Sequence, residues 1–210
     1  MKRDTREHIL QTSLELFNAL GEPRVTTNQI ALEADISPGN LYYHFRSKHD
    51  IVLELFKRFL AQFQPLLEVP ENASLEAEDL WFQLHLSFEL KGQFRFLYRN
   101  LKDLTEQVPD LGKAFLGLLS LERRAVSELI ENLEKQDKLH INAAERPLLL
   151  NNLMLALTYW IPYADLFEAG GMENGAVQST AIAGVLQMLV PYLGPHDRQQ
   201  FNLLAQRYHS

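Results

Sequence analysis

Residues 26–48 constrain the fold of this chain most strongly, because their pattern predicts two short helices joined by a tight turn. Thr27 is expected to cap the first helix, since its hydroxyl can accept a hydrogen bond from a free backbone N–H of the first turn. Ser37 is expected to cap the second helix, and Pro38 follows at the first helical position, where a missing N–H costs nothing. This layout is that of a helix-turn-helix, whose second helix enters the major groove of DNA.

The second of these helices is expected to have one buried and one exposed side. Leu41 and Phe45 lie four residues apart, and both should face the core. The other side of the helix should be exposed, and it has more aromatic residues than a surface that contacts only solvent. Its residues are Gly39, Asn40, Tyr42, Tyr43 and His44. Glycine in this surface would allow the close approach of another backbone. The second helix therefore presents a candidate contact surface.

The N-terminal part of the chain resembles the DNA-binding domain of the tetracycline-repressor (TetR) family. The shared pattern is Thr, a hydrophobic-Ala pair, Ile-Ser, Gly, Leu-Tyr-Tyr-His-Phe and a Lys soon after, over a gapless span. The resemblance implies a helix-turn-helix DNA-binding domain over residues 1–50 and a helical effector-binding and dimerisation domain over residues 51–210. A helix from residue 48 to about residue 67 is expected to bridge the two domains.

The resemblance also implies which residues contact DNA. Asn40 is expected to read a base edge, because early residues of a recognition helix face the bases; the alternative is a polar residue in solvent. The aromatic residues of this helix are expected to contact the groove and donate to phosphates, with packing against the first helix as the alternative. Lys48 resembles the family's phosphate-binding lysine at a helix N-terminus, with an ordinary solvated lysine as the alternative. The predicted set is Thr27, Asn28, Ser37, Pro38, Gly39, Asn40, Tyr42, Tyr43, His44 and Lys48.

The charge of the chain is unusual for a DNA-binding protein. The whole chain carries a formal charge of −7, and residues 1–50 contain six Lys or Arg against seven Asp or Glu. A free-standing DNA-binding domain is usually basic, so we expect basic side chains to flank the groove while the acids face elsewhere. The candidates are Lys2, Arg3 and Arg6 near the N-terminus and His44, Arg46 and Lys48 around the second helix. Dimerisation is expected to supply the remaining affinity.

The rest of the chain is predicted to be helical throughout. Near-heptad apolar spacing continues after Lys48, and no repeat or β-hairpin is visible. A boundary is expected at residues 69–72. The longer predicted helices cover residues 74–90, 109–136, 142–167 and 177–193. The predicted class is therefore all-α, with a three-helix DNA-binding domain followed by a helical bundle.

Large apolar side chains in the second part suggest a pocket for an apolar or aromatic effector. Pro162 interrupts a predicted helix shortly after a tryptophan, and irregular backbone often lines a cavity. A histidine and two tyrosine hydroxyls on the same helical faces are able to orient a ligand. The candidate ligand-binding residues are Trp81, His85, Phe88, Tyr159, Trp160 and Tyr163. For any single one of them, simple core packing is the more common role.

The last two long helices resemble the pair through which the family forms homodimers. One candidate face holds Leu148, Leu149, Asn152, Leu155, Ala156 and Tyr159, and the other holds Ala176, Thr180, Ala183, Gly184, Gln187 and Val190. The alternative is that these faces are buried within one chain. A two-fold dimer would place two recognition helices about 34–36 Å apart, which predicts a near-palindromic DNA operator.

Several other classes of protein are disfavoured by the sequence. The chain has no cysteine, and it shows no metalloprotease, Walker A, dinucleotide-binding or serine-hydrolase motif. The seven histidines lack metal-ligand spacing, so no catalytic residue, metal or cofactor is expected. No signal peptide or membrane span is expected either, which suggests a cytoplasmic protein. The favoured interpretation is a ligand-responsive repressor. The alternatives are a helical small-molecule-binding or enzyme-like protein with a vestigial DNA module, and a regulator that needs no ligand.

Overall fold

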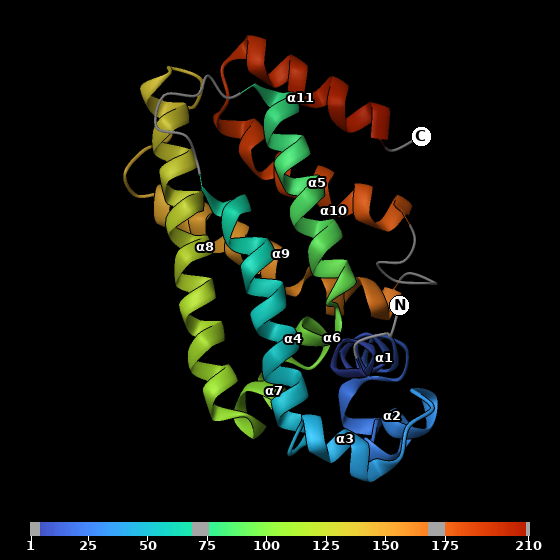
Figure 1. The fold of residues 1–210 in the computed structure, drawn as a ribbon. Coiled ribbons are helices and arrows are strands. Elements are labelled where there is room, and N and C mark those ends of the chain that lie inside the picture. Colours follow the sequence, from blue (N-terminus) through green and yellow to red (C-terminus); the bar gives the residue numbers. More distant parts are fainter. Residues whose placement is uncertain (1–4, 69–75, 168–174, 209–210) are drawn as a thin grey trace. The chain divides into compact units, whose positions relative to one another are not determined.

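The computed structural model describes residues 5–68, 76–167 and 175–208, and its elements are α-helices and short 3₁₀ helices (Figure 1). The all-α class is therefore confirmed, whereas the predicted boundary at residues 69–72 lies outside the described residues. Within these ranges, no helix combines the length and apolar character needed to cross a membrane. The elements are α1 (Thr5–Leu20), η1 (Glu22–Arg24), α2 (Thr27–Glu33), α3 (Pro38–His44), α4 (Lys48–Phe63), η2 (Gln64–Leu67), α5 (Ala77–Gln93), α6 (Phe96–Arg99), α7 (Leu101–Gln107), α8 (Pro109–Lys135), α9 (Arg146–Phe167), α10 (Gly175–Leu189), η4 (Val190–Tyr192) and α11 (Pro195–Tyr208).

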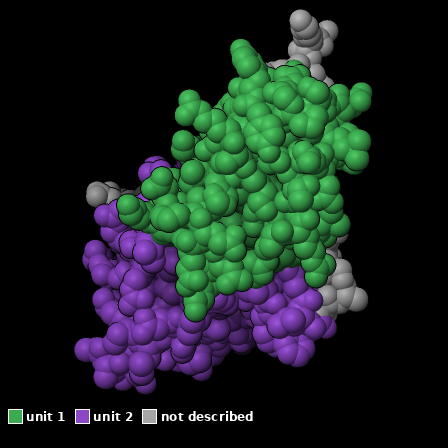
Figure 2. Space-filling model, turned by 90° about the horizontal axis from the view of Figure 1, so that it is seen from below, with its two compact units in different colours: residues 1–62, 93–115 green, residues 63–92, 116–210 purple. Residues whose placement is uncertain are grey.

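The chain packs into two compact units, which Figure 2 shows in different colours. Unit 1 comprises residues 1–62 and 93–115, and unit 2 comprises residues 63–92 and 116–210. Helices α4, α5 and α8 each contribute residues to both units. The assignment of a DNA-binding domain to residues 1–50 is a functional division and stays a prediction.

The core of unit 1 is built on one face of α1. Ile9, Leu10 and Phe17 are fully buried, at the spacing of one helix face. The helix ends at Gly21, whose φ of +84° lies in the region that favours glycine. The Asn18 amide joins α1 to the last residue of α5, because its N–H donates to the Gln93 carbonyl at 2.7 Å.

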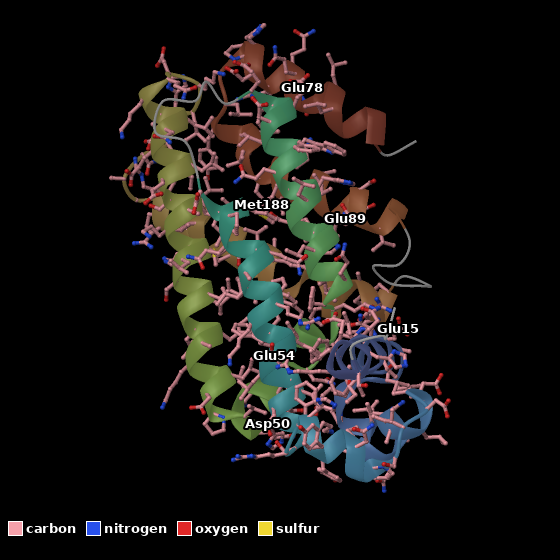
Figure 3. The ribbon with its side chains drawn as sticks, viewed as in Figure 1. Glu15, Asp50, Glu54, Glu78, Glu89 and Met188 are labelled. Atoms are coloured by element: carbon pink, nitrogen blue, oxygen red, sulfur yellow. The ribbon has the colours of Figure 1, made fainter. Side chains whose placement is uncertain are left out.

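Charged side chains join α1 to α4 on the surface of unit 1. Arg58 donates two hydrogen bonds to the two carboxylate oxygens of Glu7, at 2.6 and 2.5 Å. These bonds favour the ionised carboxylate and so hold the pKa of Glu7 below its ordinary value. Arg6 pairs with Glu54, which is labelled on α4 in Figure 3, at 3.1 Å. The two pairs help to fix the start of α1 against α4.

Two glycines of α8 give a matched test of packing against helix propensity. A Cβ on Gly112 would lie 2.7 Å from the Thr105 carbonyl oxygen, whereas a Cβ on Gly117 would meet no atom within 4 Å. We expect Gly112→Ala to destabilise the fold by about 1–3 kcal/mol, because backbone must move to relieve the clash. Gly117→Ala should stabilise by up to about 1 kcal/mol through helix propensity. Urea unfolding of both variants checks the pair, and equal effects would contradict the packing described for α8.

Unit 2 is a bundle in which α10 packs against both α9 and α11 (Figure 1). The buried side of α9 repeats every three or four residues and consists of Leu149, Leu153, Leu157, Ile161 and Ala164. Arg146, the first residue of α9, forms ion pairs with Glu131 and Glu134 of α8. This buried side of α9 faces the interior of the unit, where α5 and α8 also place apolar residues.

Candidate nucleic-acid interface and internal cavity

Helix α2 is capped by a complete capping box, although its position differs from the predicted one. Thr26, rather than Thr27, is the N-cap residue: its Oγ1 accepts from the Gln29 backbone N–H at 3.2 Å. The Gln29 side chain accepts in return from the Thr26 N–H at 2.9 Å. The prediction failed because two threonines stand in tandem, and only the first has a glutamine three residues later. Thr27 is therefore the first helical residue.

The turn and the start of α3 agree with the prediction. Asp35 adopts a φ of +52°, and the Ile36 N–H then donates to the Ala31 carbonyl at 3.0 Å, which closes the end of α2. Ser37 caps α3, because its hydroxyl accepts from the Asn40 N–H at 3.2 Å, and proline follows at the first position. On the inner side of this helix, Leu41 is fully buried.

The outer side of α3 is open to solvent. Asn40 is exposed, and the Tyr43 side chain is 84% exposed. Tyr42 is 48% exposed, and its hydroxyl shares a 2.9 Å hydrogen bond with the Thr27 hydroxyl of α2. A Cβ on Gly39 would meet only one atom, at 3.9 Å, so packing inside the protein does not require glycine there. Asn28, Ser37 and Pro38 are also not buried, and His44 is half-buried beside the Tyr43 ring.

Lys48 is not the solvated lysine that served as the alternative in the sequence prediction. Its ammonium group lies 2.8 Å from a Glu22 carboxylate oxygen and donates to the Glu22 and Val25 carbonyls at 3.0 Å each. An ammonium group has three donors, so all three are engaged within the protein. Lys48 therefore anchors the start of α4 to η1, and a contact with phosphate would require the exchange of one of these bonds.

Arg6 was expected to flank the DNA groove together with Lys2 and Arg3, but the structure gives it another role. Arg6 lies in α1, pairs with Glu54 and covers the buried Phe45 ring at 5.0 Å from its centre. It is therefore a structural residue of unit 1 rather than part of a free arm. Lys2 and Arg3 lie outside the described residues.

The six predicted ligand-binding residues of unit 2 fall into two groups, one on α5 and one on α9. On α5, Trp81 stacks on His85 with ring centres 5.0 Å apart, and Phe88 is buried. On α9, Tyr159 and Tyr163 are 52% and 54% exposed, and Trp160 is half-buried between them. None of the six lines the internal cavity described next, so their role in ligand binding stays a prediction. The three α9 residues lie away from this cavity because α9 turns another apolar side, which includes Leu153 and Leu157, toward it.

Unit 2 contains an internal cavity of about 70 Å³. Its wall is formed by apolar residues of α5, α8, α9 and α10 together with Leu66 and Leu67 of η2. Only three polar side chains contribute to it: Gln83, Ser87 and Glu122. Sequence reasoning missed this site, although one signal was available, because Glu122 interrupts an otherwise apolar helical stripe on α8.

A buried ion pair stands at the cavity wall. The Lys91 ammonium lies 2.5 Å from Glu122 Oε1, and the two side chains are 0% and 3% exposed. Lys91 also donates to the Leu157 carbonyl at 2.9 Å and lies over the Phe63 ring. The second carboxylate oxygen, Glu122 Oε2, is buried and has no hydrogen-bond partner among the residues that the structure describes. The pair therefore presents one unsatisfied acceptor inside unit 2.

A separate groove opens on the outer surface of unit 2 beside α9 and α10. It is lined by Asn152, Leu155, Ala156, Tyr159, Trp160, Tyr163 and Met188, the last of which is labelled in Figure 3. Part of the predicted dimerisation face lies here, with Leu155 58% exposed. Leu149 and Ala183 were expected on the same two faces, but they are buried within the unit and belong to its core. The side chain of Ala176 lies outside the described residues.

Comparison with known protein families gives two matches that together cover most of the chain. Residues 9–55 match the model of bacterial regulatory proteins of the tetR family. Residues 58–201 match the model of TetR bacterial transcriptional repressors. The first match contains the helix-turn-helix, and the second contains every residue that lines the cavity.

Individual relatives agree with these matches. A TetR-family transcriptional regulator from Marinobacter aquaeolei VT8 has a crystal structure that superposes with a TM-score of 0.89, at 32% identity over 100% of both chains. The regulator TtgW of Pseudomonas putida is 37% identical over 38% of this chain and 56% of its own length. The fatty acid metabolism regulator protein of Bacillus subtilis is 22% identical over 84% of this chain and 94% of its own. All three are named as regulators.

Proposed function

Because this chain belongs to the TetR family of bacterial transcriptional repressors, we propose that it binds a DNA operator as a homodimer. The dimer releases the operator when a small apolar effector fills the cavity of unit 2. The cavity carries the proposal. Its volume of about 70 Å³ is below the roughly 150 Å³ that holds benzene in an engineered protein cavity. An effector must therefore push the walls apart, and a ligand that binds only an expanded state shifts the population toward that state.

The chain connects the cavity to the DNA-binding helices through α4. Leu66 and Leu67 of the cavity wall lie in η2, which follows directly after this helix. The helix begins at Lys48, which is tied to η1 just before the helix-turn-helix. Displacement of Leu66 and Leu67 would move the end of a continuous helix, and its start would move with it. We propose that this shift changes the spacing of the two recognition helices in the dimer.

A second copy of this chain is the proposed occupant of the groove on α9 and α10. The groove is largely apolar, with Leu155 and Tyr159 more than half exposed, and a large exposed apolar patch is typical of an interaction surface. A two-fold dimer would place two copies of α3 in successive major grooves and so recognise a near-palindromic operator. Such a repressor would act in the cytoplasm, where the bacterial chromosome lies.

Asn40 is proposed to contact a base edge, and Tyr43 is proposed to contact a DNA phosphate. Asn40→Ala should cost about 1–3 kcal/mol of operator affinity and relax the sequence preference, because a base-reading amide is lost. Tyr43→Ala should weaken binding to all sequences by a similar factor, since a phosphate contact carries no sequence information. Gln11→Ala, which removes an exposed amide from α1, is the matched control. Titration of each variant against the operator and a scrambled duplex checks the assignment, and an unchanged preference for Asn40→Ala would remove it as a base reader.

In vitro selection of genomic DNA fragments tests the proposed function while the effector is still unidentified. The purified full chain is mixed with fragments of the source genome at near-physiological salt, and bound fragments are sequenced. We expect enrichment of an inverted repeat whose half-sites are about one helical turn apart. A folded dimer that enriches no sequence would contradict the proposal and favour the alternative of a vestigial DNA module.

A further inference from the structure

The two oxygens of the buried Glu122 carboxylate have different surroundings. Oε1 accepts a short hydrogen bond from Lys91, at 2.5 Å. Oε2 is also buried, and it accepts no hydrogen bond from the part of the chain that the structure describes. Leaving a buried acceptor unsatisfied is costly, more so when it is charged. An oxygen of this kind in a cavity wall favours a bound molecule that supplies a hydrogen-bond donor.

The other polar groups of the wall do not supply that donor. The Ser87 hydroxyl donates its only hydrogen to the Gln83 carbonyl at 2.8 Å. One N–H of the Gln83 side-chain amide donates to the Leu66 carbonyl at 2.8 Å, and neither N–H reaches Glu122 Oε2. The rest of the wall consists of leucine, isoleucine, valine and alanine. The wall is therefore mostly apolar, and Glu122 Oε2 is its one buried side-chain acceptor without a hydrogen-bond partner among the described residues.

The charge of the site selects further among ligands. Lys91 neutralises Glu122, so the pair adds no net charge to the cavity. A carboxylate ligand would place a second negative charge near Oε2 in an apolar surrounding, where repulsion is strong. An ammonium ligand would add a positive charge for which the wall holds no further acid among its described residues. Both kinds of ion would also lose their hydration.

We propose that the effector is an uncharged apolar molecule with one hydroxyl group, of the phenol or alkanol class, and that its hydroxyl donates to Glu122 Oε2. Lys91 is a positioning residue in this site, because it holds Oε1 and leaves Oε2 without a partner. The inference rests on the proposed function in taking this cavity as the effector site. It goes beyond it by excluding carboxylates, fatty acids included, from the cavity.

Three ligands of similar size test the inference on the unmodified protein: phenol, toluene and benzoate. Isothermal titration calorimetry of the full chain should give a dissociation constant for phenol at least roughly tenfold lower than for toluene, because a hydrogen bond to a charged group is worth more than about 1.4 kcal/mol. Benzoate should show no binding in this cavity. Equal affinities for phenol and toluene, or tighter binding of benzoate, would overturn the inference.

A double variant separates the role of the carboxylate from a general effect on folding. Lys91→Met with Glu122→Met replaces the ion pair by apolar side chains of similar length, a change that buried pairs often tolerate. This variant should bind toluene but lose the preference for phenol. Glu89→Gln alters an exposed glutamate of α5 (labelled in Figure 3), and the preference should survive in it. A preference retained in the double variant would show that another group binds the hydroxyl.

A structure of the phenol complex and an operator titration separate ligand recognition from operator release. The phenol oxygen should lie about 2.5–3.0 Å from Glu122 Oε2; an ordered water in that position, with phenol elsewhere, would overturn the inference. If phenol binds as expected but operator affinity does not change, the proposed release mechanism fails while the assignment of the ligand class holds. If a carboxylate releases the operator from this cavity, the release mechanism holds and the assignment fails.

Discussion

Replacement of Lys91 by methionine should destabilise the fold by about 3–5 kcal/mol, because it leaves a buried carboxylate without its counter-charge. Lys91 is 0% exposed, and its partner Glu122 is 3% exposed, so water cannot replace the lost partner without opening unit 2. The lost hydrogen bond to the Leu157 carbonyl adds to the cost. Urea unfolding monitored by circular dichroism measures the effect as a lower transition midpoint.

Two control variants test whether the stability lost in Lys91→Met comes from the unpaired Glu122 carboxylate. The double variant Lys91→Met with Glu122→Met should recover most of the stability, because no charge then remains in the interior. Lys102→Met removes a lysine that is 85% exposed and lies 4.0 Å from Glu106, and it should leave the midpoint unchanged. If Lys91→Met were as stable as Lys102→Met, the ion pair would not be buried as described.

Tyr159→Glu should abolish dimer formation and lower operator affinity at least about 100-fold. In a two-fold interface the new carboxylate appears on both protomers, so two like charges would be desolvated in the apolar groove. The loss of affinity should be large because each DNA-binding region is weakly charged, with six basic and seven acidic residues in positions 1–50. A monomer bound to one half-site of the operator therefore gains little affinity from attraction to the DNA phosphates. Analytical ultracentrifugation gives the oligomeric state, and fluorescence anisotropy gives the operator affinity.

A matched substitution on another surface controls for the introduced charge. Leu203 of α11 is 52% exposed, as Tyr159 is, but it does not line the groove. Leu203→Glu should therefore remain dimeric and bind the operator normally. A dimeric Tyr159→Glu variant with normal operator affinity would place the dimer interface on a different face.

Local signals in the sequence predicted the helices well. Pro109 opens α8 and Ser37 caps α3 as expected, because proline and serine act within the first turn. Asn142 accepts from the Glu145 N–H at 2.9 Å ahead of α9, again through a local contact. The break between α6 and α7 was not predicted, since it occurs at Asn100, with φ −126° and ψ 42°, and no glycine or proline marks it.

The site was harder to predict because its contacts are not local. The acceptors around Lys48 are 23 and 26 positions earlier in the chain, so the sequence could not reveal that its ammonium group is engaged. The apolar residues of α9 point in several directions, so the spacing of Tyr159 and Tyr163 could not distinguish an inner from an outer face. The charge of Glu122 conflicts with its position on the apolar face of α8, and such conflicts are often functional.

The coupling between the cavity and the operator is tested by operator binding with the cavity empty, occupied and blocked. Ala125 lines the cavity and is 8% exposed, so Ala125→Leu should fill the space from within, and calorimetry should then detect no ligand binding. We predict that saturating phenol weakens the operator affinity of the unmodified protein at least about tenfold, a typical coupling of more than about 1 kcal/mol. Phenol should have no effect on Ala125→Leu, which should bind the operator as tightly as the ligand-free protein does. Unchanged operator affinity in the unmodified protein, with calorimetry showing the cavity occupied, would contradict the proposed release of the operator.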